Sequence, residues 1–134
     1  MNVRLLIGDD DPLMRVFVSV ALGDFADTVE AANGIEVLDL LREQHFDLVL
    51  LDWDMPDCDG LAVLTTLRER ECPTPIIMIT AKNERGNVLQ AVHSGASDYL
   101  IKPFEAASLR EKVQKHLPEQ CKAPTASGHV ATRF

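Results

Sequence analysis

The sequence predicts a doubly wound α/β fold, in which helices cover both faces of a parallel sheet. Two observations support this prediction. Short apolar segments alternate with longer segments of helical periodicity, and polar or turn-forming residues follow each apolar segment. Strict alternation of strand and helix requires right-handed crossovers, which make the strands parallel. At 134 residues, 46% of them hydrophobic, the chain has the length and the apolar content of one domain.

The first expected strand covers residues 3–7. Asp11 then supplies an N-cap and Pro12 a suitable first helical residue for a helix that runs to about residue 24. Residues 28–31 form a weaker strand, which we expect at an edge of the sheet.

A second helix is expected after the turn at Asn33 and Gly34. Its apolar stripe at helical spacing consists of Ile35, Leu38 and Leu41. Residues 48–51 are continuously apolar, which suits a parallel strand covered on both faces. We therefore expect this strand at the centre of the sheet.

The third helix is expected at residues 61–67, and it ends before Pro73 and Pro75, which cannot continue it. Residues 76–79 form the fourth strand. A fourth helix covers residues 83–93. The apolar side chains that we expect it to turn inward are Val88, Leu89 and Val92.

Gly95 occupies the usual C-cap position of that helix, and residues 99–101 form the fifth strand. The last helix covers residues 105–117. Its inward positions are Leu109, Val113 and Leu117. Residues 118–134 have no hydrophobic period and too few apolar groups to offset the entropy of ordering, so we expect a flexible tail.

Composition excludes several classes of function. The net charge of −8 has the wrong sign for a domain that neutralises nucleic acid phosphates by itself. No apolar run reaches the length of a membrane-spanning helix, and the N-terminus lacks the pattern of a signal peptide, so we expect a soluble protein of the cytoplasm that does not bind a membrane. The cysteines have neither zinc-site nor disulfide-framework spacing and are expected to be reduced: Cys58, Cys72 and Cys121.

Polar residues of complementary chemistry follow four of the expected strands. Asp9 and Asp10 follow the first strand, Asp52 the third, Thr80 the fourth and Lys102 the fifth. The carboxyl ends of parallel strands gather such groups at one edge of a sheet. Carboxylates, a hydroxyl and an ammonium together can hold a divalent cation beside a phosphorylatable aspartate. Each residue alone would be an ordinary turn or surface residue, and only their joint occurrence indicates a site.

A second group of acids lies just after the third strand. It consists of Asp52, Asp54, Asp57 and Asp59. We interpret this concentration of negative charge as part of a cation site rather than as a solvated face.

Four segments of the chain carry a family resemblance: LLIGDDDPLMR, FDLVLLDWDMPDCDG, PIIMITA and GASDYLIKPF. In order and spacing they resemble the motifs of response-regulator receiver domains of two-component signalling. The resemblance covers about residues 3–117, so it implies a receiver domain at residues 1–117 and a tail or linker stub at 118–134. It also implies the flavodoxin-like receiver fold, with strand order 2-1-3-4-5 and five helices.

The resemblance assigns a chemical role to each acid. Asp52 would be the nucleophile that accepts a phosphoryl group from a histidine kinase or a histidine phosphotransfer protein. Asp9, Asp10 and Asp52 would ligate Mg²⁺, or Mn²⁺ in its place, together with the backbone carbonyl of Asp54. Lys102 would supply the second positive charge that stabilises the phosphoryl group.

The resemblance also implies two conformational states. Thr80 would hydrogen-bond the phosphoryl group, and Tyr99 would move with it. The surface of the fourth helix, fifth strand and fifth helix would then change its affinity for an output domain, a target protein or a second copy of the chain. The peptide bond between Lys102 and Pro103 is expected to be cis.

Some positions depart from the family pattern or vary within it. Gly8 stands where an apolar residue usually ends the first strand, so we expect looser packing or a bulge beside the acidic pair. Asp54 and Lys82 lie two residues after Asp52 and Thr80 respectively, at positions that influence hydrolysis of the acyl phosphate. We expect their opposite charges to pair across the mouth of the site, hinder water and prolong phosphorylation.

Two other functions are compatible with parts of the pattern. Asp52 and Asp54 resemble the acid pair of haloacid-dehalogenase-like phosphohydrolases, but the order of motifs along the chain argues against this class. A purely structural pseudo-receiver would not need the complete acid set. We therefore expect a phosphoacceptor switch that promotes its own phosphorylation and dephosphorylation, rather than an enzyme acting on other substrates.

Overall fold

The sheet of this protein has five parallel strands in the order β2-β1-β3-β4-β5. The computed structural model describes residues 3–81 and 85–117. The strands are β1 (Val3–Gly8), β2 (Ala26–Ala31), β3 (Leu48–Asp52), β4 (Ile76–Thr80) and β5 (Asp98–Ile101). The expected fold class and strand order are therefore confirmed, with β2 at an edge and β3 at the centre.

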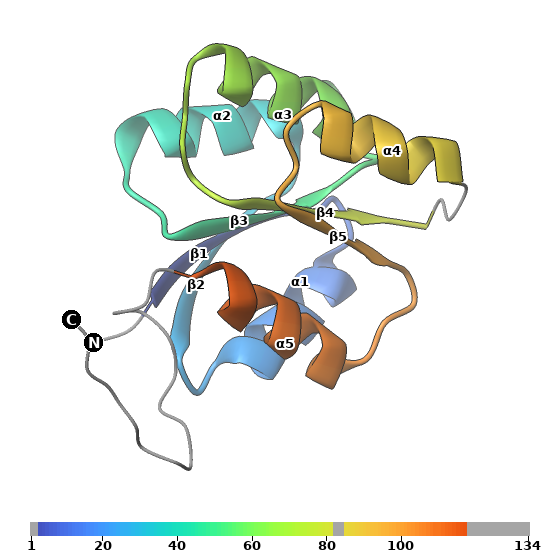
Figure 1. Ribbon diagram of the computed structural model, residues 1–134. Coiled ribbons are helices and arrows are strands. Elements are labelled where there is room, and N and C mark those ends of the chain that lie inside the picture. Colours follow the sequence, from blue (N-terminus) through green and yellow to red (C-terminus); the bar gives the residue numbers. More distant parts are fainter. Residues whose placement is uncertain (1–2, 82–84, 118–134) are drawn as a thin grey trace, which may run out of the picture.

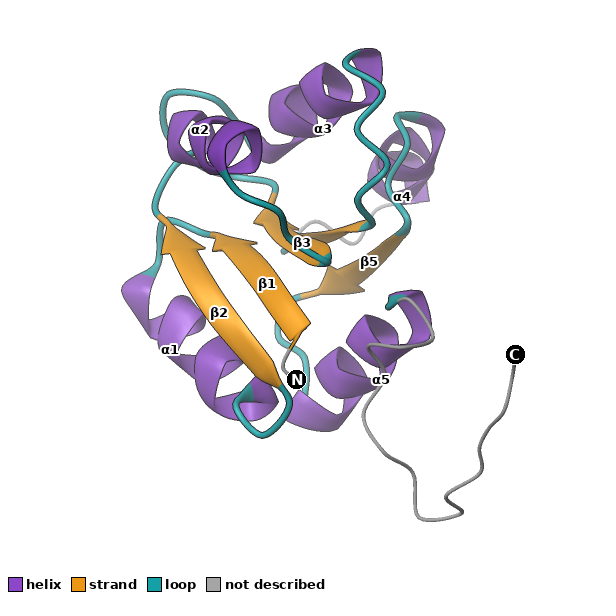
Figure 2. Ribbon diagram, turned by 90° about the vertical axis from the view of Figure 1, so that its left-hand side faces the viewer, coloured by secondary structure: helices purple, strands orange, loops and turns teal. Residues whose placement is uncertain are grey.

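Helices cover both faces of this sheet. They are α1 (Pro12–Leu22), α2 (Gly34–Glu43), α3 (Gly60–Glu69), α4 (Arg85–His93) and α5 (Ala106–His116). Figure 1 shows α1 and α5 on one face and α2, α3 and α4 on the other, and Figure 2 shows the same three layers from the side of β2. Within the described ranges, no helix has the length and apolar character needed to cross a membrane. The predicted tail at residues 118–134 lies outside the described residues.

Local interactions explain where several helices begin. The Asp11 side chain accepts a hydrogen bond from the backbone N–H of Leu13, so the expected N-cap of α1 is confirmed. Asp59 caps α3 in the same way, by accepting from the N–H of Ala62 at 2.8 Å. Gly95 follows α4 with φ 109, a left-handed conformation that favours glycine.

Each face of the sheet has its own apolar core. Every residue of β3 and β4 is buried, which matches their continuously apolar sequences. Leu109 and Val113 of α5, and Leu117 directly after it, pack into the core shared with α1, as their spacing predicts. Burial of each such side chain contributes roughly 1.5–3 kcal/mol, so the two cores stabilise the sheet that carries the residues at its carboxyl edge.

The predicted inward faces of two helices are partly wrong. In α4, Leu89 and Val92 are 60% and 53% exposed, whereas Ala91 is buried. In α2, Ile35 is 48% exposed and Val37 is fully buried. Successive helical residues are about 100° apart, so a helix that packs through Ala91 or Val37 must point its near neighbours outward. The sequence pattern offers two apolar stripes in each helix, and packing against the sheet selects one of them.

Gly8 does not loosen the sheet. The parallel register runs without interruption through Gly8, which pairs with Ala31 on β2 and Leu51 on β3, so the expected bulge is absent at this position. A Cβ atom at Gly8 would lie 2.6 Å from Cγ2 of Val37 and 3.7 Å from the Met55 sulfur. The side chains of Val37 and Met55 therefore occupy the space beside the glycine, and the predicted loose packing is wrong.

We expect Gly8→Ala to lower the free energy of unfolding by about 1–3 kcal/mol, because the added methyl group overpacks this part of the core. Adding Val37→Ala should recover part of that loss by removing the methyl group that the new Cβ meets. Urea unfolding of the single and double variants measures both effects. Strictly additive losses would contradict the packing account.

Candidate functional site

The carboxyl ends of β1, β3, β4 and β5 bring the predicted site residues together. Asp9 directly follows β1, Asp52 is the last residue of β3 and Thr80 is the last residue of β4. Asp52 pairs in register with Ile79, and Thr80 pairs with Ile101, the residue before Lys102. The strand ladder thus places groups from distant parts of the chain on one edge, where the order of the strands changes direction.

Three carboxylates form the centre of this site. One oxygen from each of Asp9, Asp10 and Asp52 lies within 4.8 Å of the others. Asp9 and Asp52 are only 1% and 4% exposed, whereas Asp10 faces solvent. Within the part of the chain that the structure describes, the buried polar or charged side chains are Asp9, Asp52 and Thr80. The predicted acid cluster is thus present, and it is open to solvent on the side of Asp10.

The Asp9 side chain is held by hydrogen bonds from two directions. Its Oδ1 accepts a hydrogen bond from the backbone N–H of Asp11 at 2.9 Å. Its Oδ2 lies 3.4 Å from the ammonium of Lys102. The same ammonium lies 3.2 Å from Oδ1 of Asp52, so one lysine is shared by the two buried carboxylates. The peptide bond between Lys102 and Pro103 is cis, as the resemblance implied.

Proton affinities in the site reflect its excess of negative charge. Burial, reinforced by the charge of Asp9 and opposed by Lys102, raises the pKa of Asp52 to about 6. Burial alone would lower the pKa of Lys102, but the adjacent Asp52 and Asp9 outweigh it, and the net shift is upward. Lys102 is thus cationic at neutral pH, and its single charge does not fully compensate the acids.

These residues fit a small, hard divalent cation. Mg²⁺ prefers oxygen ligands and usually binds proteins through one or two carboxylates while it keeps several waters. Asp9 and Asp52 provide buried carboxylates, Asp10 provides an accessible one, and their oxygens converge. A cation at this point would also relieve the repulsion that raises the pKa of Asp52.

The loop after β3 is built around Asp52. The backbone N–H of Trp53 donates to the carbonyl of Ile79 at 2.8 Å, and that of Gly60 donates to the carbonyl of Trp53 at 2.8 Å. A Cβ atom at Gly60 would collide with the backbone oxygen of Asp52, so this close approach requires glycine. The β3–α3 loop therefore folds back on the strand end and fixes the position of Asp52.

The second acidic group that we predicted does not act as a unit. Asp54 and Asp57 are exposed, and Asp59 caps α3. Of the four acids, Asp52 belongs to the converging cluster. The predicted ligand role of the Asp54 carbonyl stays a prediction, and so does the Asp54–Lys82 pair, because Lys82 lies outside the described residues.

Thr80 and Tyr99 lie on the same side of the sheet. Residues two apart in a strand point to the same face, so Thr80 shares the face of Met78, which pairs in register with Tyr99. Met78 belongs to the core under α2, α3 and α4, and the half-buried Tyr99 packs against that core. Tyr99 therefore lies on the same face as Thr80, two positions before the residue of β5 that pairs with Thr80.

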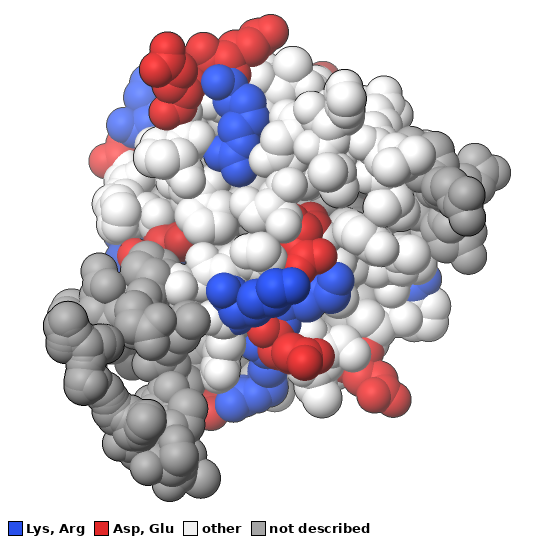
Figure 3. Space-filling model, viewed as in Figure 1, with Lys and Arg blue, Asp and Glu red and all other residues white. Residues whose placement is uncertain are grey.

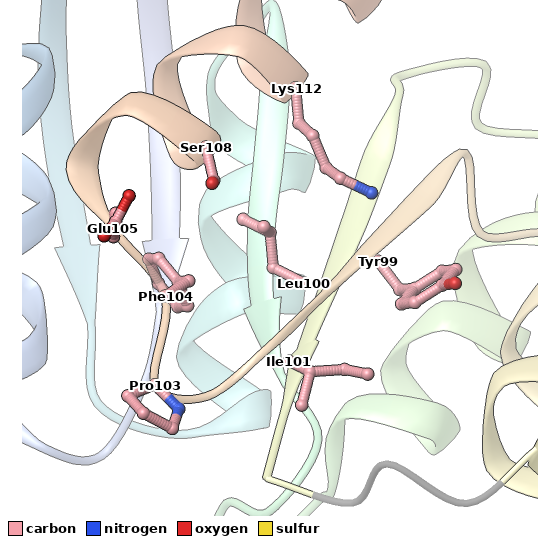
Figure 4. Close-up of a pocket in the computed structure, with 8 residues that line it drawn as sticks. All are labelled: Tyr99, Leu100, Ile101, Pro103, Phe104, Glu105, Ser108 and Lys112. Carbon is pink, nitrogen blue, oxygen red and sulfur yellow. The ribbon is translucent and has the colours of Figure 1, made fainter.

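An ionic network that the sequence did not reveal holds Tyr99 to α5. The Lys112 ammonium lies 4.8 Å from the centre of the Tyr99 ring and 2.8 Å from Oδ1 of Asp98, and His116 Nε2 lies 2.9 Å from Oδ2 of Asp98. Burial would raise the pKa of Asp98, but hydrogen bonds from Lys112, His116 and its neighbouring backbone lower it to about 2. Figure 4 shows Lys112 extending from α5 toward Tyr99, at a hollow of about 350 Å³ between β5 and α5.

A family model covers nearly all of the described chain. The model of the response regulator receiver domain matches residues 5–114. Chemotaxis protein CheY-3 of Vibrio cholerae is 39% identical over 118 residues, which is 85% of this chain and 91% of that protein. Chemotaxis protein CheY of Pseudomonas aeruginosa is 36% identical over 117 residues, 84% of this chain and 94% of that protein.

Solved structures agree with these matches. The Francisella response regulator 1452 receiver domain has a TM-score of 0.81 and 34% identity, covering 84% of this chain and 93% of that one. Vibrio cholerae chemotaxis protein CheY4 also has a TM-score of 0.81, with 28% identity, covering 87% of this chain and 100% of that one. The similarity therefore extends over the sheet and the helices that position the site.

We expect Asp52→Asn to stabilise the cation-free protein above pH 6, by up to about 3 kcal/mol, and to have little effect below about pH 4. The raised pKa means that the folded state favours protonated Asp52, so its stability falls as pH rises through about 6, whereas asparagine stays neutral. Urea unfolding at pH 4 and pH 8 in the presence of EDTA measures the difference. The matched control is Asp39→Asn, which removes an exposed partner of Arg42 and should show no such trend.

Proposed function

The chain belongs to the family of response regulator receiver domains, which act as phosphoacceptor switches, and from this premise we propose that Asp52 is the residue that accepts the phosphoryl group. The observation that supports this proposal most directly is the convergence of Asp9, Asp10 and Asp52 opposite the Lys102 ammonium. Asp52 is the member of this group that ends the central strand, and its carboxylate lies 3.2 Å from the Lys102 ammonium, compared with 3.4 Å for Asp9. The donor is the phosphohistidine of a histidine kinase or a phosphotransfer protein.

The transfer is a nucleophilic displacement at phosphorus. An oxygen of the Asp52 carboxylate forms a bond to phosphorus, the bond from phosphorus to the donor imidazole breaks, and the imidazole nitrogen keeps the electron pair. Mg²⁺, when bound by Asp9, Asp10 and Asp52, would supply positive charge to the phosphoryl oxygens. The buried strand ends hold the nucleophile in place, which suits a reaction that depends mainly on positioning and electrostatics.

Lys102 neutralises the charge that arrives with the phosphoryl group. In this structure its ammonium is shared between Asp9 and Asp52, at 3.4 and 3.2 Å. Acyl phosphate formation converts the Asp52 carboxylate into a mixed anhydride, which no longer carries the carboxylate charge, and adds phosphoryl oxygens nearby. Lys102 can then contact one of these oxygens without moving far, and its raised pKa keeps it charged while it does so.

We assign the switch to Thr80 and Tyr99. Thr80 ends the strand next to β3, and its hydroxyl is the group that would donate to a phosphoryl oxygen on Asp52. That movement would change the space beside Tyr99 on the same face of the sheet. Since Lys112 packs on the Tyr99 ring and pairs with Asp98, a new position of the ring would change the position of the Lys112 ammonium on α5.

The surface that would respond to the movement of Thr80 and Tyr99 consists of α4, β5 and α5. Figure 3 shows basic and acidic side chains gathered over α5, beside a largely uncharged area over α4. Leu89 and Val92 contribute exposed apolar surface on α4, and the hollow beside Tyr99 lies at the junction with α5. A partner with an apolar segment and an acidic group next to it would match this surface. An output domain, a target protein or a second copy of the chain could provide that partner.

Incubation with Mg²⁺ and a small phosphodonor such as acetyl phosphate should add one phosphoryl group to each chain, measured as a mass increase by intact-protein mass spectrometry. Asp52→Asn should add none, because the amide is not a nucleophile. Asp57→Asn, which alters an exposed acid in the same loop, should be labelled like the wild type. Labelling of Asp52→Asn at the wild-type level would contradict the assignment, and many turnovers of a phosphate ester would indicate a hydrolase.

The role of Thr80 can be measured at Tyr99, the single tyrosine of the chain. With 3-fluorotyrosine incorporated, phosphorylation of the wild type should shift the one ¹⁹F resonance. In Thr80→Ala the protein should still be labelled, but the shift should fall to less than half because the hydroxyl link is absent. Thr28→Ala, which removes a hydroxyl on the opposite edge strand that bonds Ser19, is the control. An undiminished shift in phosphorylated Thr80→Ala would exclude this coupling.

A further inference from the structure

Arg15 connects the acidic site to the edge strand of the sheet. It lies on the first turns of α1, and its side chain is 18% exposed. Its Nη1 donates a hydrogen bond of 2.7 Å to the backbone carbonyl of Asp9. Its Nε donates one of 2.8 Å to Oε1 of Glu30 on β2. The guanidinium therefore bridges the Asp9 carbonyl, beside the acid cluster, and the Glu30 carboxylate. The Glu30 contact fixes the orientation of the guanidinium.

The carbonyl that Arg15 contacts belongs to the peptide unit between Asp9 and Asp10. The backbone N–H of Asp9 donates to the carbonyl of Ala31 at 3.0 Å, which continues the β1–β2 ladder to Asp9. Beyond Asp9 the ladder ends, and the direction of the next peptide plane depends on what binds its carbonyl. Because this plane joins the two acids, its orientation determines how the exposed Asp10 is directed relative to the buried Asp9 and Asp52.

We propose that Arg15, oriented by Glu30, is a positioning residue for the divalent cation: it fixes the Asp9–Asp10 peptide so that the carboxylates of both residues face Asp52. This inference rests on the proposed cation site and adds a residue to it. The hydrogen bonds of Arg15 go to a backbone carbonyl and to Glu30 rather than to the carboxylate oxygens of the cluster. It acts through the backbone, as residues behind metal ligands commonly do.

Charge and positioning predict opposite effects for the loss of Arg15. If the guanidinium acted only as a nearby positive charge, its removal would tighten cation binding, because one repulsive charge would disappear. If it acts by orienting the peptide, its removal weakens binding, because Asp10 is no longer directed at the cluster. The sign of the change in affinity thus separates the two accounts.

Arg110 provides a matched control elsewhere on the same face of the sheet. It also projects from a helix, and its Nη1 donates to the backbone carbonyl of Ala21 at 2.8 Å and to Oδ1 of Asp24 at 2.7 Å. Arg110→Gln therefore removes the same kind of bridge between a carbonyl and a carboxylate. It does so away from the acid cluster, at the C-terminal end of α1.

The test is Mn²⁺ binding to the full chain without phosphodonor, measured by the loss of the free-ion signal in electron paramagnetic resonance. Arg15→Gln should weaken binding by about tenfold, the lower end of the effect seen when groups behind metal ligands are removed. Arg110→Gln should bind like the wild type. Arg15→Lys keeps the charge but cannot bridge both acceptors, so it should weaken Mn²⁺ binding by less than Arg15→Gln does. It replaces Arg15→Gln in the test if the glutamine variant does not fold.

Equal or tighter binding by Arg15→Gln, or by folded Arg15→Lys where the glutamine variant is unfolded, would overturn the positioning role. Equal weakening in Arg15→Gln and Arg110→Gln would also overturn it, because the effect would then be one of general stability. Failure of the wild type to bind Mn²⁺ would instead refute the proposed cation site. The cation site and the positioning role of Arg15 are therefore refuted by different results.

Discussion

Repulsion between two buried carboxylates, only partly balanced by one ammonium, is the constraint that the rest of this structure has to satisfy. Asp9 and Asp52 are almost fully enclosed, and Lys102 is shared between them. Neither acid would be held there by local sequence, since isolated carboxylates favour water by several kcal/mol. The apolar cores on both faces of the sheet stabilise the strands enough to keep the acids together. The site thus uses stability that the rest of the fold provides.

The same geometry explains why the molecule suits a switch better than a hydrolase. A phosphohydrolase of the haloacid-dehalogenase type would use Asp52 and Asp54 as a working pair, but Asp54 is exposed and lies outside the converging cluster. The groups that do lie next to Asp52 are Lys102 and the end of β4, and both connect to β5. Phosphorylation at Asp52, as proposed, would therefore act on the surface at this edge of the sheet rather than on the turnover of a substrate.

The sequence was sufficient for the order of elements, through its periodicity, and for the acid cluster, through strand-end positions together with the strand order that the family resemblance implied. It was insufficient where packing chooses between equivalent stripes, as in α4, where the small Ala91 is buried and Leu89 is exposed. Gly8 was misjudged because the side chains that fill its surroundings come from distant parts of the sequence, namely α2, β3 and the β3–α3 loop. Arg15 was missed as well: an arginine one turn after a helix cap has no distinctive pattern, and its role depends on β2 being adjacent.

The distribution of the site along the chain has a consequence for the timing of its appearance. Asp9 follows the first strand, whereas Lys102 follows the last, and the two residues touch only when β1, β3, β4 and β5 are assembled in order. A chain in which β5 has not yet docked therefore lacks the Lys102 ammonium beside Asp9 and Asp52. If Asp52 is the phosphoacceptor that we propose, such a chain would lack the ammonium that balances the charge of the phosphoryl group.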